Sequence, residues 1–115
     1  MYWITYYKLG YFDQSFQNYT NAISINPYNI FYHNNLGKLL IEHGKKDQAL
    51  KSYIKSYLLN PNFDQKMLLA EFYLKEKMDC ENGLKFLEDA LVDRPMDTRA
   101  LAYKYFALRG LERFN

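Results

Sequence analysis

The sequence predicts an all-α fold, an α-solenoid of antiparallel helix hairpins, and three observations support this. The prolines, Pro27, Pro61 and Pro95, stand 34 residues apart. Small residues recur at the same interval, with large residues recurring beside them. Within each interval, apolar residues follow at steps of three and four, the spacing of one helix face. A fixed period with helical spacing inside it is typical of stacked hairpins that bury one another's apolar faces.

The composition fits one folded domain. The chain has 115 residues, 49% of them hydrophobic and 24% charged, so it carries enough apolar surface to fold. Its net charge of +2 is low for a protein built to grip phosphate. No stretch approaches the roughly 20 apolar residues of a membrane helix, so we predict no membrane insertion. The single cysteine, Cys80, excludes an internal disulfide. It slightly favours the cytoplasm and leaves a bacterial periplasm open.

The second helix of each hairpin is predicted over residues 13–25, 47–59 and 80–92. Each presents two small positions flanking a large one at the repeat interval, and these columns are Ser15, Ala49, Gly83; Tyr19, Tyr53, Leu87; and Ala22, Ser56, Ala90. A small side chain lets the partner helix approach closely. The residue pair that contains each proline is predicted to end the helix, because proline disfavours the α conformation in the residue before it.

The first helices are predicted over residues 28–43 and 63–77, and a last helix over 97–113. Gly10 and Gly44 are predicted to end the first helix of their pairs, because glycine accepts the left-handed conformation after a helix. Met78 stands at the third such place, so an altered turn is expected there.

One position of the first helices departs from the pattern. Glu71 and Tyr105 stand where the best copy has Gly37, so looser or shifted packing between helices is expected at both.

These residues resemble the tetratricopeptide repeat family, whose pattern has Trp, Leu-Gly and Tyr in the first helix and Ala, an aromatic, Ala and Pro in the second. The best copy is formed by His33, Leu36, Gly37, Leu40, Ala49, Tyr53, Ser56 and Pro61. The resemblance implies a right-handed superhelix. It also implies a truncated repeat at residues 1–27, full repeats at 28–61 and 62–95, and a capping helix or half-repeat at 96–115.

The resemblance places a groove for a peptide or a partner subunit on the first helices. The outward-facing residues predicted to line it are Ile4, Tyr7, Lys8, Phe31, Asn34, Asn35, Lys38, Glu42, Gln65, Leu69, Phe72, Tyr103, Phe106 and Arg109. The asparagines would hydrogen-bond a peptide backbone, and the aromatic rings would hold apolar anchors. For Leu69 and Phe72, simple packing of the next hairpin is an equal alternative.

Some members of the family clamp the carboxy-terminal carboxylate of a partner. The matching places in this chain are Ile4, Asn35, Gln65 and Leu69, and only Asn35 keeps the residue type of that clamp. With no cation at the third-repeat places, a carboxylate would go unpaired. We therefore predict that this chain has no carboxylate clamp.

No catalytic, cofactor or metal site is predicted. His33 stands in the column usually held by Trp, which indicates packing, and His43 precedes Gly44, where an imidazole can bond the last helix carbonyls. Cys80 is interpreted as a structural thiol.

The leading hypothesis is a non-catalytic protein-interaction scaffold. An accessory domain of a larger enzyme or membrane protein that recognises substrate is the alternative. An RNA-binding helical repeat is disfavoured by the low charge, so no nucleic-acid partner is predicted. A homodimer is further predicted through the amino-terminal end, which is rich in aromatic residues: Tyr2, Trp3, Tyr6 and Tyr7.

Overall fold

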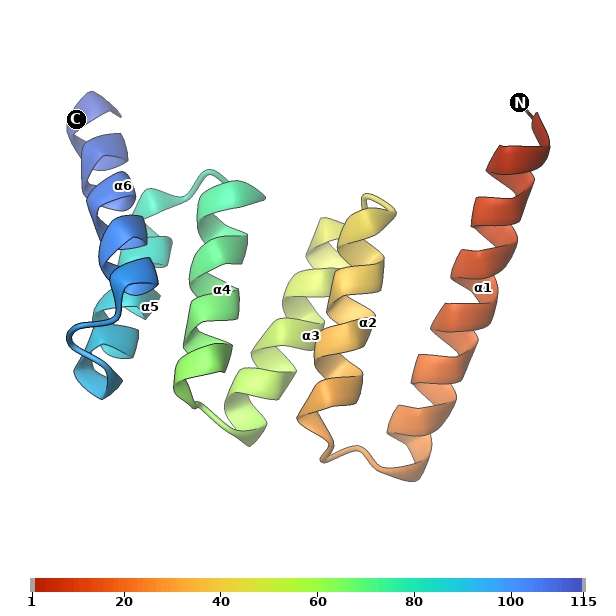
Figure 1. The fold of residues 1–115 in the computed structure, drawn as a ribbon. Helices are drawn as coiled ribbons and strands as arrows, with labels where there is room; N and C mark the ends of the chain where they lie inside the picture. The colour runs from red at the N-terminus through yellow and green to blue at the C-terminus, as the bar shows by residue number, and fades with distance from the viewer. Residues whose placement is uncertain (1, 115) are drawn as a thin grey trace. The chain divides into compact units, whose positions relative to one another are not determined.

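The computed structural model describes the backbone of residues 2–114 and the side chains of residues 10–112, and this part of the chain contains six helices and no strand. The helices are α1 (Tyr2–Ile25), α2 (Ile30–Glu42), α3 (Lys46–Leu59), α4 (Phe63–Lys75), α5 (Cys80–Asp93) and α6 (Thr98–Phe114) (Figure 1). The all-α prediction is confirmed for these residues. Among them, no helix is long and apolar enough to cross a membrane. The chain divides into two units, residues 1–59 and 60–115.

In the first unit, α2 packs against both α1 and α3, and α2 and α3 form an antiparallel hairpin (Figure 1). Ala49 and Tyr53 of α3 are buried. Gly37 of α2 lies so close to Tyr53 that a Cβ there would be 2.7 Å from the ring atom Cε1. The predicted packing of small residues against large ones is confirmed in this hairpin.

The prediction that Gly10 ends a helix is wrong. Helix α1 runs without a break through Gly10, and Gly44 is the only glycine of the described residues with a positive φ. Among the described residues outside the adjoining helix backbone, no atom lies within 4 Å of the place that a Cβ on Gly10 would occupy. Each residue added to a helix gains a backbone hydrogen bond, so a helix continues where no tertiary contact favours a turn.

Helix α2 ends at the predicted glycine. Gly44 has a φ of +75°. Its N–H donates to the Ile41 carbonyl over 3.0 Å, and the Lys45 N–H donates to the Leu40 carbonyl over 2.8 Å. These two bonds around a left-handed residue form a Schellman motif, which satisfies carbonyls that the helix end leaves unpaired.

The turn after α4 is altered, as expected from Met78. This residue has a φ of 53°, the left-handed conformation that Gly44 also adopts. The Asp79 N–H donates to the Tyr73 carbonyl over 2.8 Å. This bond spans one residue more than the Lys45–Leu40 bond that closes the turn after α2. A non-glycine residue in this conformation is strained, so the wider turn is held by its neighbours.

The second unit packs α5 between α4 and α6. Its core joins apolar and small residues of all three helices, and the buried members are Met67, Ala70, Leu74, Leu87, Ala90, Ala100 and Ala107. Gly83 allows α4 and α5 to approach, since a Cβ on it would lie 2.8 Å from Leu74. The buried Lys66 ammonium is 2.8 Å from the Asp93 carboxylate. This ion pair was not predicted from the sequence.

The helix boundaries follow local chemistry. Helices α1, α3 and α5 each end two residues before a proline, as predicted. Four helices begin after a side chain that accepts a hydrogen bond from a backbone N–H of the first turn, and these capping residues are Asn29, Asn62, Asp79 and Asp97. Such caps satisfy donors that have no partner inside the helix.

Candidate functional site

The structure places the predicted groove residues in three classes. Seven have accessible side chains: Phe31, Asn35, Lys38, Glu42, Phe106 and Arg109 are exposed or nearly so, and Tyr103 is half-buried. Ile4, Tyr7 and Lys8 lie outside the residues whose side chains are described. The accessibility predicted for Asn34, Gln65, Leu69 and Phe72 is wrong, because all four are buried.

The burial of the α4 residues follows from a second apolar stripe on that helix. Met67, Ala70 and Leu74 belong to the core of the second unit. Leu69 and Phe72 stand beside them at helical spacing and are also buried, with Gln65 on the same stripe. Removal of large apolar side chains from water is favourable. Helix α4 therefore offers little side-chain surface on this stripe for a ligand.

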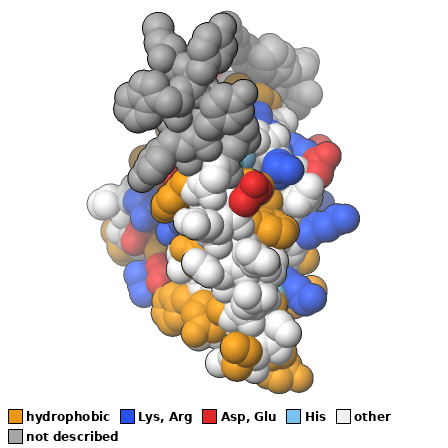
Figure 2. All heavy atoms as spheres, turned by 90° about the vertical axis from the view of Figure 1, so that its right-hand side faces the viewer, with side chains coloured by type: hydrophobic (Ala, Val, Ile, Leu, Met, Phe, Trp, Pro, Cys, Tyr) orange, Lys and Arg blue, Asp and Glu red, His pale blue; other side chains and the backbone are white. Residues whose placement is uncertain are grey.

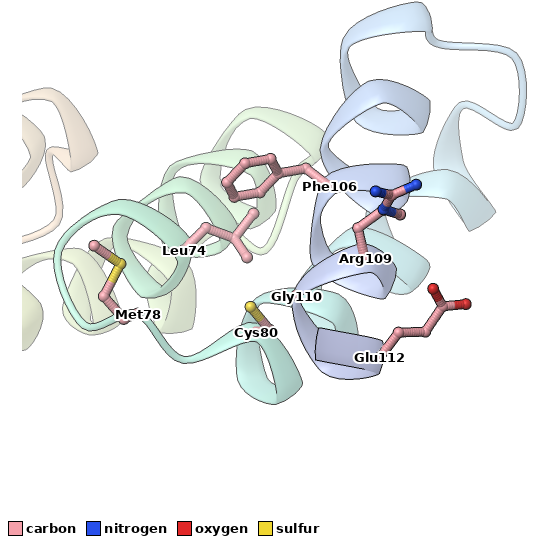
Figure 3. Close-up of a pocket in the computed structure, with 7 residues that line it drawn as sticks. All are labelled: Leu74, Met78, Cys80, Phe106, Arg109, Gly110 and Glu112. Carbon is pink, nitrogen blue, oxygen red and sulfur yellow. The ribbon is translucent and has the colours of Figure 1, made fainter. Parts of the chain in front are cut away.

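The second unit instead carries a groove between α4 and α6 (Figure 3). Its main cavity has a volume of about 810 Å³ and is lined by Leu74, Met78, Cys80, Phe106, Arg109, Gly110 and Glu112. A neighbouring cavity of about 510 Å³ shares Leu74, Met78 and Phe106, and adds Lys75, Ala102 and Tyr103. We call these two cavities together the α4–α6 groove.

Phe106 dominates the wall of the α4–α6 groove. Its ring projects from α6 toward α4, near Leu74, and Met78 lies on the far side (Figure 3). Phe106 is 60% exposed, so its ring is accessible to a ligand. Of the residues that line the groove, Tyr103, Phe106 and Arg109 were predicted from the sequence, whereas Leu74 and Met78 were not. The repeat pattern places Leu74 at a core position and Met78 at a turn position, so neither was expected to line a groove.

A polar network joins α4 to α6 at the edge of the groove. The Glu71 Oε1 atom accepts hydrogen bonds from the Arg99 guanidinium and from the Tyr103 hydroxyl, each over 2.9 Å. The Lys75 ammonium lies 5.4 Å from the centre of the Tyr103 ring. A hydrogen bond with the Tyr103 side chain, followed by the Glu71 carboxylate, raises the pKa of Lys75 above its usual 10.5. Lys75 is therefore a cation at neutral pH.

The same network explains how α4 tolerates a glutamate at the position of Gly37. Glu71 turns its carboxylate toward α6, away from the close contact between Leu74 and Gly83. The looser packing expected at Glu71 is thus replaced by an ion pair with Arg99, whose N–O distance is 2.9 Å.

A smaller groove lies in the first unit between α1 and α2. Its volume is about 190 Å³, and it is lined by Tyr11, Ser15, Tyr19, Asn35, Lys38, Leu39 and Glu42. We call it the α1–α2 groove. Figure 2 shows the side of the molecule on which α1 lies, where uncharged side chains and backbone form a central band and hydrophobic side chains gather at the lower end. Ile25 and Tyr28, at the end of α1 and in the following loop, are among the exposed apolar residues.

Both histidines have structural partners. His33 is buried and its Nε2 atom donates to the Pro27 carbonyl over 2.9 Å. His43 Nδ1 donates to the Leu39 carbonyl over 3.1 Å, near the end of α2. The predicted packing and capping roles are confirmed. Among the described residues, no group of three His, Cys, Asp or Glu side chains is arranged to hold a metal ion.

Comparison with known proteins supports the repeat pattern. The tetratricopeptide repeat family matches residues 4–29 and 32–63, which together make up half of the chain. No curated protein sequence matches. Among solved structures, the thermophilic TPR protein TTC0263 of Thermus thermophilus is 25% identical over 86% of this chain, with a TM-score of 0.77. The chain spans half the length of that protein.

Two other similar structures contain a bound segment of another protein. The first TPR domain of Spaghetti (RPAP3), bound to the HSP90 peptide SRMEEVD, is 21% identical over 94% of this chain and 86% of its own, with a TM-score of 0.71. PcrH in complex with the chaperone binding region of PopD is 21% identical over 96% of this chain and 83% of its own, with a TM-score of 0.63.

Proposed function

Because the chain belongs to the tetratricopeptide repeat family, we propose that it is a non-catalytic protein-interaction module that binds a segment of a partner protein in the α4–α6 groove. Two proteins of similar fold hold peptide segments of other proteins, which supports a partner of this class. The observation that carries the proposal is the exposed Phe106 ring on the wall of an apolar cavity beside the charged Lys75.

The chemistry of the groove indicates what the partner segment carries. A cavity of about 510 Å³ bounded by Leu74, Met78 and Phe106 suits an apolar side chain. Lys75 lines this cavity and Arg109 lines the neighbouring one, so an acidic side chain next to the apolar anchor would gain a charged hydrogen bond. Glu112 lines the other end of the groove. This mixture of charges suits a protein segment better than the uniform phosphate backbone of a nucleic acid.

A carboxylate clamp is not part of the proposal. Of the places that match it in the described side chains, only Asn35 is exposed, whereas Gln65 and Leu69 are buried. The partner segment is therefore held by its side chains. The accessory-domain alternative stays open, and in that case the same groove would recognise a substrate of the larger protein.

Selection from a random peptide library tests the proposal. A phage-displayed library is panned on the wild-type chain, and the recovered peptides are measured against Phe106→Glu and against Leu58→Glu as the matched control. Leu58 is 73% exposed on α3, outside the groove. The proposal expects peptides that combine an apolar residue with acidic neighbours. They should lose at least tenfold in affinity to Phe106→Glu and keep their affinity for Leu58→Glu. Equal affinity for both variants would contradict it.

A further inference from the structure

One stripe of α6 is uncovered, although the counterparts of its Leu108 in α2 and α4 are buried. Tyr105 and Leu108, three residues apart on this stripe, are 64% and 42% exposed. Leu40 and Leu74 stand 68 and 34 residues before Leu108, and they are 2% and 3% exposed. In α4, this position packs against the second helix of the hairpin, where Leu74 meets Gly83. Among the described residues, α6 has no such second helix on this stripe.

Helix α1 carries the other half of the same interface. Ser15, Tyr19 and Ala22 are only half-buried. The residues that stand 34 and 68 positions later are all buried, and they are Ala49, Tyr53, Ser56, Gly83, Leu87 and Ala90. Ser15 and Tyr19 line the open α1–α2 groove. Helix α1 is thus a second helix of the repeat without its own first helix against it among the described residues.

We infer that copies of this chain associate head to tail, with α6 of one copy seated in the α1–α2 groove of the next. In this register, Leu108 lies against Ser15 of the next copy as Leu74 lies against Gly83 within the chain. The association completes the interface that each hairpin already forms, so it buries Tyr105 and Leu108 together with Tyr19.

The α2 side of the α1–α2 groove is complementary to α6 in charge. Met78, which follows α4, and Phe106 of α6 line one cavity within the chain. The residue 34 positions after Met78 is Glu112, and the residue 68 positions before Phe106 is Lys38. In the inferred association, α6 of one copy packs against α2 of the next in the way that α4 packs against α6 within one chain. Glu112 of the first copy therefore faces Lys38 of the second. Both are exposed in the chain alone.

A second pair in the same register is apolar on both sides. Arg99 pairs with Glu71 within the chain. The corresponding residues across the inferred contact are Phe31 and Tyr105, which are 69% and 64% exposed. The aromatic side chains of Phe31 and Tyr105 thus face each other, and in the same register the acidic Glu112 faces the basic Lys38. Two matched pairs in one register favour a second copy over an unrelated helix as the occupant.

Tyr105 occupies the place of Gly37. The contact between α6 of one copy and α1 of the next is therefore expected to be wider than the contact between α2 and α3. Tyr105 leans along its own helix, and the Arg109 guanidinium donates to its hydroxyl over 3.4 Å. Glu71 leans out of the α4–α5 contact in a similar way toward Arg99. The repeat therefore accommodates a large side chain at this position by turning it away from the contact within the hairpin.

The inferred contact joins two different surfaces and leaves a free end on each copy. Such a heterologous contact adds further copies as concentration rises and does not stop at a dimer unless the assembly closes into a ring. The homodimer predicted from Tyr2, Trp3, Tyr6 and Tyr7 would join like surfaces and would stop at two. The contact leaves the Phe106 ring free, although Glu112, which it engages, also lines one end of the α4–α6 groove.

Sedimentation velocity on two end variants tests the inference. Tyr105→Glu/Leu108→Glu blocks the α6 end, and Ser15→Arg blocks the α1 end by placing a large cation in the α1–α2 groove. The wild-type mass should rise with concentration above twice the 13.8 kDa of one chain. Each variant alone should remain a monomer. A mixture of the two should form a 1:1 dimer, because one intact end of each kind remains.

Controls separate a blocked end from a misfolded chain. Each variant should keep the helical circular dichroism and the melting temperature of the wild type within a few degrees, and Leu101→Glu offers a second substitution on the same α6 stripe. Leu58→Glu, an equal change on exposed α3 surface, should associate as the wild type does. A monomeric wild type at all concentrations would overturn the inference. So would an α6-blocked variant that still dimerises, or an equimolar mixture that stays monomeric.

Discussion

At the scale of single residues, small side chains decide how closely the helices approach. The repeat interval predicted that small residues face large ones, and the structure brings Gly37 and Tyr53 into contact. Asn34 and Glu71 were not placed correctly, because repeat position indicates a helix face but does not indicate what covers that face. Asn34 is buried, and Glu71 turns toward Arg99. A polar side chain at such a position can be buried or can pair with a neighbouring helix, and the repeat position does not distinguish the two.

Gly37→Ala should destabilise the chain. The new Cβ would lie 2.7 Å from the Tyr53 ring, and that ring is buried and cannot turn aside. Overpacking of this kind costs about 1–3 kcal/mol, which outweighs the gain of roughly 1 kcal/mol from the better helix propensity of alanine. Urea denaturation monitored by circular dichroism measures the change. An unchanged or raised midpoint would contradict the packing described for α2 and α3.

Tyr103→Phe should lower the pKa of Lys75 toward its usual value. The hydrogen bond with the Tyr103 side chain is the largest cause of the raised pKa, ahead of the Glu71 carboxylate. A raised lysine pKa stabilises the fold at pH values below the unfolded-chain pKa of about 10.4, and this is lost as the pH rises through the folded value. NMR titration of the Lys75 side chain checks this, with Tyr28→Phe as control. An unmoved titration midpoint would exclude Tyr103 as the cause.

At the scale of helices, the sequence predicted most boundaries because their signals are local. Proline ends α1, α3 and α5, and Gly44 ends α2. Gly10 was assigned the same role because it stands 34 residues before Gly44, yet α1 continues through it. Glycine permits a turn and does not require one. The chain would turn at Gly10 only if a first helix packed against the second, and the interval between glycines does not indicate whether such packing occurs.

Gly10→Ala distinguishes the continuous helix from the predicted turn. In a helix interior with open space around the new Cβ, alanine should stabilise the chain by roughly 0.5–1 kcal/mol. At a left-handed turn, the same change would destabilise it, as Gly44→Ala should, since Gly44 has a φ of +75°. Thermal melts of both variants measure the difference. A lowered melting temperature for Gly10→Ala would restore the predicted hairpin.

At the scale of the whole molecule, the family could be predicted from the sequence, but the α4–α6 groove could not. The 34-residue interval is repeated along the chain, so errors at single positions do not hide it. The α4–α6 groove depends on the strained turn at Met78 and on the position of the Phe106 ring. The right-handed superhelix and the repeat divisions at residues 27, 61 and 95 stay predictions.

Recognition of the partner segment should not depend on a free carboxy terminus. The places that match the family's clamp are buried at Gln65 and Leu69, so no cation there can meet a carboxylate. An acidic peptide and its carboxy-terminal amide should therefore bind equally, within about twofold, since loss of a charged hydrogen bond would cost about 1.5–3 kcal/mol. Fluorescence anisotropy compares the two forms. A tenfold preference for the free acid would contradict the prediction.

The most direct test of peptide binding by the α4–α6 groove is an amide NMR titration with a peptide selected on the wild-type chain. The account predicts that the largest shifts map to the groove residues Leu74, Lys75, Met78, Ala102, Tyr103 and Phe106, and that Phe106→Glu abolishes them. Shifts confined to the exposed faces of α3 and α5, or an unchanged pattern with Phe106→Glu, would contradict it.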